Sequence, residues 1–169
     1  MIAEFTVENY RSFKGKHTFS LISTKDRELA ETNTFLLDKE LSFLKTAIIY
    51  GANASGKSNF FSALHFFLSF SNDSGPAKQI GDPIEIEPFV LSKQTETAPS
   101  SFEIVFFLKE GSTVTRYRYG LTVNNKQVVL EYLFAVNNVR EITLFTRKFQ
   151  EINYTFRDGY TVLVRFPNK

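Results

Sequence analysis

The sequence predicts an α/β fold, more closely described as α+β, with a mixed sheet around one loop and an antiparallel β-meander after it. Three observations predict this fold. Residues 2–8 alternate between apolar and polar side chains, which is typical of a half-buried strand. Residues 45–70 read as an apolar run, a glycine-rich loop and a helix. From residue 84 onward, short strand-like runs are separated by turn residues.

The N-terminal region is predicted as two strands joined by a turn. The first strand covers residues 2–8, the turn residues 9–15 and the second strand residues 17–22. Residues 23–41 are rich in charged side chains and are predicted to lie on the surface, with a short strand at 34–37. We expect the two strands to form a small sheet beside the glycine-rich loop.

The glycine-rich loop lies between a predicted strand and a predicted helix. Residues 46–50 are mostly β-branched and aromatic, which is typical of a buried central strand in a parallel sheet. Residues 51–58 match the pattern G-x-x-x-x-G-K-[ST]. Residues 59–70 contain no Pro or Gly, and their apolar side chains recur near helical spacing. We therefore expect a helix that packs against the sheet.

The loop pattern is typical of segments that bind the phosphates of a nucleotide. Gly51 leaves room for the turn, and Gly56 lets the backbone approach a phosphate closely. The backbone N–H groups of residues 53–58 would point at the β-phosphate, at the positive end of a helix. Lys57 would reach the β- and γ-phosphates, and the Ser58 hydroxyl would bind Mg²⁺. The candidate binding residues are Gly51, Ala52, Asn53, Ala54, Ser55, Gly56, Lys57 and Ser58. The alternative is a Gly/Ser-rich turn that binds nothing.

The second half of the chain is predicted as a run of antiparallel strands. Turn residues separate them, among which Asp158-Gly159 is a strong two-residue hairpin signal. Over residues 116–123, tyrosines and arginines alternate and therefore fall on opposite faces of a strand. The predicted strands are residues 85–91, 101–109, 113–123, 127–136, 141–148, 151–157 and 160–166.

Length and composition limit the class of protein. The 169 residues suit one domain, or part of a larger one. We divide them into a nucleotide-binding core (1–72), a loop rich in Gly, Pro and Ser (73–83) and a β-rich subdomain (84–169). The chain has no Cys, which excludes disulfides and thiolate metal sites, and it shows no signal peptide. These features fit a cytoplasmic protein, and the apolar run at 60–70 is too short to span a membrane.

Charge is distributed unevenly along the chain. Residues 111–169 hold nine Lys/Arg and four Asp/Glu, whereas residues 1–110 hold eleven and fourteen. The basic C-terminal half could face nucleic acid, or it could be a solvated strand face. His17 and His65 are far apart in the sequence and lack a carboxylate cluster, so they are interpreted as packing or surface residues.

Several segments carry a resemblance to known groups of ATPases. Residues 9–13, Asn-Tyr-Arg-Ser-Phe, resemble the N-[FY]-R-S-F opening of ABC-type ATPase heads, which include the SMC-like, RecF-like and OLD-like proteins. Residues 49–59 resemble the phosphate loop of the same proteins, including the Asn at position 53 and the Asn after the Ser. Residues 99–104, 117–120 and 131–133 resemble bacterial AAA-family ATPases that are grouped with OLD-like and abortive-infection proteins.

The resemblance implies an ATP-binding role with Mg²⁺ as cofactor. It would place Arg11 and Ser12 near the nucleotide, with Arg11 helping to hold phosphate, and it adds Asn59 to the binding residues. The alternative for Arg11 is a turn residue with a solvated guanidinium. In such ATPases, ATP clamps two heads into a homodimer and controls an attached effector, such as a nuclease, or a DNA contact. The implied roles are DNA repair and anti-phage defence.

The sequence departs from the pattern of these ATPases in one respect. We find no Walker B strand with its catalytic Glu and no LSGGQ-like signature, and both normally lie far downstream. We therefore expect the N-terminal part of a longer ATPase, which alone binds nucleotide weakly and hydrolyses it negligibly. A rival interpretation is a β-rich module that binds protein or nucleic acid through residues 84–169, with a vestigial phosphate loop. A GTPase or a small-molecule kinase is disfavoured, because no N-K-x-D motif is present and the strands after the helix are predicted to form hairpins in place of βα crossovers.

Overall fold

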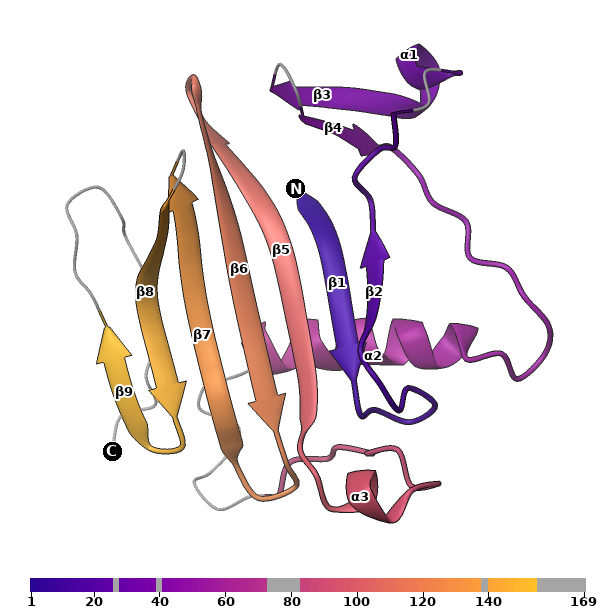
Figure 1. Cartoon of the computed structure of the whole chain (residues 1–169), viewed down its shortest axis with the longest axis vertical. Helices are drawn as coiled ribbons and strands as arrows, with labels where there is room; N and C mark the ends of the chain where they lie inside the picture. The colour runs from indigo at the N-terminus through magenta and orange to yellow at the C-terminus, as the bar shows by residue number, and fades with distance from the viewer. Residues whose placement is uncertain (26–27, 39–40, 73–82, 138–139, 155–169) are drawn as a thin grey trace.

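The computed structural model describes residues 1–25, 28–38, 41–72, 83–137 and 140–154. Seven strands form one sheet in the order β2-β1-β5-β6-β7-β8-β9, and two form a separate small sheet, β3-β4. Helix α2 crosses one face of the large sheet (Figure 1). The elements are β1 (Ile2–Glu8), β2 (His17–Ser20), α1 (Ala30–Asn33), β3 (Thr34–Asp38), β4 (Leu41–Leu44), α2 (Lys57–Asn72), α3 (Lys93–Glu96), β5 (Ser100–Glu110), β6 (Thr113–Val123), β7 (Val128–Asn137), β8 (Arg140–Lys148) and β9 (Glu151–Tyr154).

The large sheet joins the N-terminal strands to the meander. Strand β1 pairs antiparallel with both β2 and β5, so Phe5 lies opposite Phe19 on one side and Ile104 on the other. Strands β5 to β9 then follow one another as antiparallel neighbours. The predicted strands at 2–8 and from 101 to 148 are confirmed, with boundaries that shift by one residue at most.

The main core lies between α2 and the sheet. Ala63 and Phe67 of the helix are buried against Phe5, Phe102 and Leu121 of the strands. The rings of Phe5 and Phe67 lie with their centroids 5.8 Å apart. The predicted helix and its packing against the sheet are confirmed. One face of the helix places its aromatic side chains on the apolar face of the sheet.

The opposite face of the sheet carries a smaller core at one end. Phe43 of β4 is buried there against Ala3 and Val105, and its ring centroid lies 5.4 Å from that of Phe107. The short strand predicted at 34–37 is confirmed as β3. Apolar side chains of β3 and β4 thus pack on those that β1 and β5 present on this side.

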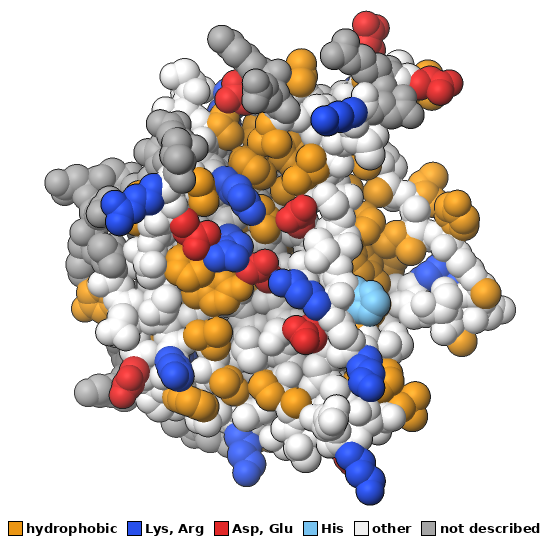
Figure 2. Space-filling view, viewed as in Figure 1, with side chains coloured by type: hydrophobic (Ala, Val, Ile, Leu, Met, Phe, Trp, Pro, Cys, Tyr) orange, Lys and Arg blue, Asp and Glu red, His pale blue; other side chains and the backbone are white. Residues whose placement is uncertain are grey.

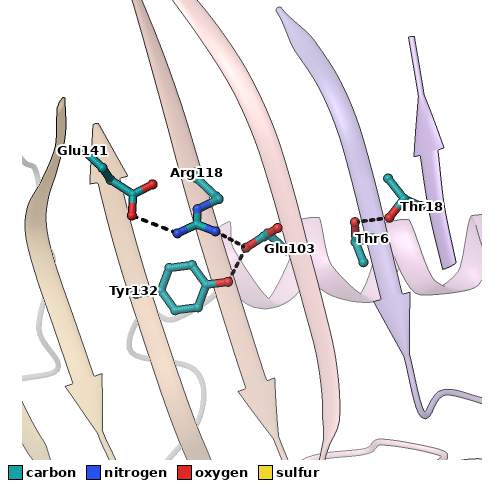
Figure 3. A network of polar contacts seen from close by, with 6 residues as sticks. All are labelled: Thr6, Thr18, Glu103, Arg118, Tyr132 and Glu141. Atoms are coloured by element: carbon teal, nitrogen blue, oxygen red, sulfur yellow. Dashed lines mark hydrogen bonds and ion pairs between the residues drawn. The ribbon is translucent and has the colours of Figure 1, made fainter. Parts of the chain in front are cut away.

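A polar network covers the centre of that face (Figure 3). The Arg118 guanidinium lies 2.9 Å from a Glu141 oxygen and 3.6 Å from a Glu103 oxygen, and the Tyr132 hydroxyl donates to Glu103. The Tyr132 ring lies across Gly120, where any Cβ would collide with it. Gly120 therefore permits the network by leaving space above the central strand.

The structure corrects the predicted strand at residues 46–50. This segment forms no strand, and the side chains of Ile48 and Tyr50 are 82% and 90% exposed. Every strand pairing among the described residues is antiparallel, so no parallel neighbour is present there to pair with the segment. The predicted mixed sheet around the loop is therefore wrong for the described part of the chain.

A second correction concerns residues 85–91. They were predicted as a strand, but residues 85–89 belong to no strand or helix and residues 90–91 form a turn. Their backbone bonds instead to the turn after β1, where the Arg11 N–H donates to the Glu87 carbonyl at 2.8 Å. Residues 73–82 of the loop predicted at 73–83, and the predictions for 155–169, including Asp158-Gly159, lie outside the described residues. Within the described part, no helix has the length and apolar character needed to span a membrane.

Candidate functional site

The glycine-rich loop lies directly before α2 and has an unusual backbone. Ala54 and Gly56 both have left-handed backbone angles, with φ of +61° and +94°. A Cβ on Gly56 would lie 3.0 Å from the Ser12 Oγ, and a Cβ on Gly51 would lie 2.8 Å from the Ser55 Oγ. Gly56 is therefore favoured by its left-handed conformation, whereas a side chain at Gly51 would require the Ser55 hydroxyl to turn away.

Lys57 folds back across the loop. Its ammonium group donates to the carbonyls of Gly51 and Ala52, each at 2.7 Å, and lies 3.4 Å from the Ser55 Oγ. The loop and the first residues of α2 surround a cavity of about 370 Å³. The residues that line it are Asn53, Ala54, Ser55, Gly56, Lys57, Ser58 and Asn59. This lining contains a cation and no carboxylate, which favours an anion.

The start of α2 adds a second source of positive potential. The N–H of Phe60 donates to the Gly56 carbonyl at 3.0 Å. The N–H groups of the residues just before Phe60 therefore lie at the start of the helix, where N–H groups have no hydrogen-bond partner within the helix. Such amides, together with the helix dipole, favour negative charge at this end of a helix. The exposed Ser58 hydroxyl lies in the same first turn.

The turn after β1 contacts the loop and the first turn of α2. Asn59 donates from its side-chain amide to the Ser12 Oγ at 2.9 Å, and the same Oγ lies over Gly56. The turn is closed by reciprocal backbone bonds between Tyr10 and Phe13 of 3.0 and 2.8 Å. The structure thus brings Ser12, Gly56 and Asn59 together, although they are far apart in the sequence.

Arg11 lies at a neighbouring cavity and not at the loop cavity. Its guanidinium pairs with the Glu87 carboxylate at 2.7 Å and lies over the Tyr10 ring, 5.5 Å from its centroid. The hydrogen bond to Glu87 raises the pKa of Arg11 above its usual value, so the guanidinium stays charged. Its role toward phosphate stays a prediction.

Comparison with known protein families adds an independent observation. Residues 47–159 match a family described as AAA domain, AbiEii toxin-like, of type IV toxin–antitoxin systems. The chain belongs to this family of AAA domains. The assignment makes it a P-loop nucleotide-binding domain, in agreement with the loop geometry. Neither the curated proteins nor the solved structures contain a significant match.

Sequence reasoning missed two residues that shape the site of this AAA domain. Asn9 is buried, donates to the carbonyls of Thr95, Ala98 and Pro99 at 2.9, 2.9 and 3.2 Å, and accepts from the Phe89 N–H at 3.1 Å. Glu87 holds Arg11. The only sequence signal for Glu87 was the alternation at 84–87, and alternation does not indicate which distant residue a side chain will meet.

The sheet face opposite α2 does not present a single-sign charged surface. Figure 2 shows Lys and Arg side chains interspersed with Asp and Glu over this face. Arg118, one of the arginines expected there, is paired with two carboxylates. His17 and His65 are both exposed, and the described residues contain no cluster of metal-binding side chains.

Proposed function

We propose that this AAA domain binds Mg·ATP through residues 51–59, with the phosphates in the 370 Å³ cavity of the loop. One observation carries the proposal. The Lys57 ammonium already lies inside the curve of the loop, on the carbonyls of Gly51 and Ala52. An incoming triphosphate offers oxygens with full negative charge, which form stronger bonds to an ammonium than neutral carbonyls do.

Each residue of the loop has its own role in binding. Lys57 exchanges its carbonyl partners for the β- and γ-phosphates, while the amides at the start of α2 face the phosphate chain. The Ser58 hydroxyl is the protein ligand for Mg²⁺, which usually takes one or two protein oxygens and completes its shell with phosphates and water. The bound ion would neutralise phosphate charge. Ser12 and Asn59 brace the loop through their 2.9 Å contact.

The proposed function is binding, and hydrolysis would need further groups. The residues that line the loop cavity include no carboxylate that could orient a water molecule. The resemblance at residues 9–13 and 49–59 supports an ABC-type head of the SMC-like, RecF-like and OLD-like kind. In that setting two heads would close on ATP and control an effector nuclease or a DNA contact in DNA repair or anti-phage defence.

Thermal unfolding with and without Mg·ATP tests the proposal. At a concentration 100 times the dissociation constant, ligand binding stabilises a fold by about 2.7 kcal/mol, which corresponds to roughly 5–10 °C for a chain of this size. We expect this shift for the wild type and for the control Lys126→Ala, an exposed turn residue, and its loss in Lys57→Ala. An absence of any shift in the wild type would favour the rival function, a β-rich interaction module.

Turnover measurements separate binding from hydrolysis. The chain alone is expected to hydrolyse ATP no faster than the Lys57→Ala variant, because the residues that line the loop cavity include no carboxylate that could position water. Steady-state turnover of the wild type well above that variant would contradict this part of the proposal.

A further inference from the structure

A second cavity lies beside the loop cavity. It has a volume of about 520 Å³, which falls in the range of small-molecule sites. Asn59 lines both cavities, so they meet at the first turn of α2. The residues that line the second cavity are Arg11, Asn59, Ile86, Glu87, Pro88 and Val90.

The position of Asn59 relates the second cavity to the ends of a bound triphosphate. In a phosphate loop, the Lys reaches the β- and γ-phosphates while the backbone cradles the α- and β-phosphates. Asn59 is two residues beyond Lys57 along α2. The nucleoside leaves the phosphate chain at its α-phosphate, so a cavity that begins at Asn59 is suitably placed to receive it.

The walls of the second cavity have the chemistry that a nucleoside needs. Ile86, Pro88 and Val90 provide apolar surface, and the Val90 side chain is 63% exposed and so open to a ligand. A base has two apolar faces that lose contact with water when they pack on such a wall. The paired Arg11 and Glu87 add a planar cation and a carboxylate, which can contact polar edges of a base or ribose.

One turn holds both cavities in place. Ser12 of this turn contacts Asn59, while Arg11 binds the backbone and side chain of Glu87. Asn9 accepts a hydrogen bond from the Phe89 N–H, which fixes the apolar wall from its other side. The distance between the phosphate loop and the wall is therefore set by residues 9–12, and little reorganisation is required when a ligand spans both cavities.

We infer that the second cavity is the nucleoside subsite of the nucleotide whose phosphates the loop binds, an inference that rests on the proposed function. Residues 86–90 form the wall against which the base packs, and the Arg11–Glu87 pair is a positioning device for that wall. Nucleoside triphosphates then bind more tightly than inorganic tripolyphosphate, which reaches only the loop.

Calorimetric titration of the chain with Mg·ATP and with Mg·tripolyphosphate tests this inference. The variant is Val90→Asn, which makes the wall polar without adding charge. The matched control is Leu91→Asn, because Leu91 is the next residue, is 85% exposed and does not line the cavity. Both positions are exposed, so we expect both variants to fold, and their unfolding temperatures check this.

We expect Val90→Asn to weaken Mg·ATP about tenfold, which is the effect of altering one apolar contact in a pocket, and to change tripolyphosphate affinity less than about twofold. Leu91→Asn should leave both affinities unchanged. Equal weakening of both ligands by Val90→Asn, or no weakening of ATP, would overturn the nucleoside subsite while the phosphate site stands. If the wild type binds neither ligand, the proposed function fails and the inference fails with it.

Discussion

The meander β5–β8 and the segment 45–56 contrast in how their strand-like sequences fold. Each strand of the meander pairs along its length with the strand that follows it in the chain. Residues 46–50 have an equally strand-like composition, yet they pair with nothing described and expose Ile48 and Tyr50. A strand pattern is therefore sufficient where a short turn supplies the partner, and insufficient where the partner must come from elsewhere.

The largest expected effect tests the core between α2 and the meander. Phe67→Ala removes a buried ring between α2 and the meander and should lower the free energy of unfolding by about 3–5 kcal/mol. Phe61→Ala, on the same helix but 58% exposed, should change it by less than about 0.5 kcal/mol. Urea unfolding of both variants measures the difference, and similar losses for the two would contradict the assigned faces of α2.

A smaller effect is expected at the centre of the sheet. Gly120→Ala places a Cβ into the Tyr132 ring and should cost about 1–3 kcal/mol, as overpacking does. Gly15→Ala is the matched control, since a Cβ there meets nothing within 4 Å. The double variant Gly120→Ala with Tyr132→Ala should recover part of the loss. If Gly120→Ala is as stable as the control, the position of the Tyr132 ring across β6 is wrong.

The pH dependence of stability gives a further measure of the meander. Burial, and then the hydrogen bond to Glu103, raises the pKa of Tyr132 above its usual value near 10. Above pH of about 10 the unfolded chain loses this proton while the folded chain keeps it, so stability falls as pH rises. Tyr132→Phe should therefore reduce this alkaline decline. The test is to measure the free energy of unfolding between pH of about 8 and about 11, a range that includes the usual Tyr pKa. If this free energy falls equally steeply with pH in the wild type and in Tyr132→Phe, the raised pKa of Tyr132 is refuted.

The smallest effect is expected at residues 46–50, which have no strand partner among the described residues. Ile48→Ala should change the stability of the chain by less than about 0.5 kcal/mol, because the side chain is already in water. A buried parallel strand, as the sequence predicted, would lose about 2–5 kcal/mol from the same substitution. Thermal or urea unfolding separates these outcomes by a wide margin.

The same contrast explains how much of the molecule could be predicted. The meander, α2 and its packing follow from local periodicity and turn residues, which act between neighbours in the chain. The loop motif indicated its own glycines and Lys57. Asn9 and Glu87 could not be predicted in their roles, because each contacts residues more than 70 positions away. Residues 46–50 could not be distinguished from a buried strand, since composition alone does not show whether a partner strand is present.

The central claim is that residues 51–59 form a binding site for the phosphates of ATP. Hydrogen–deuterium exchange of the chain with and without Mg·ATP tests it most directly, because the method reports on backbone amides. We predict slower exchange at 53–60, which carries the loop amides, and unchanged exchange in β6 and β7. Protection confined to the meander, or absent throughout at saturating Mg·ATP, would contradict the account.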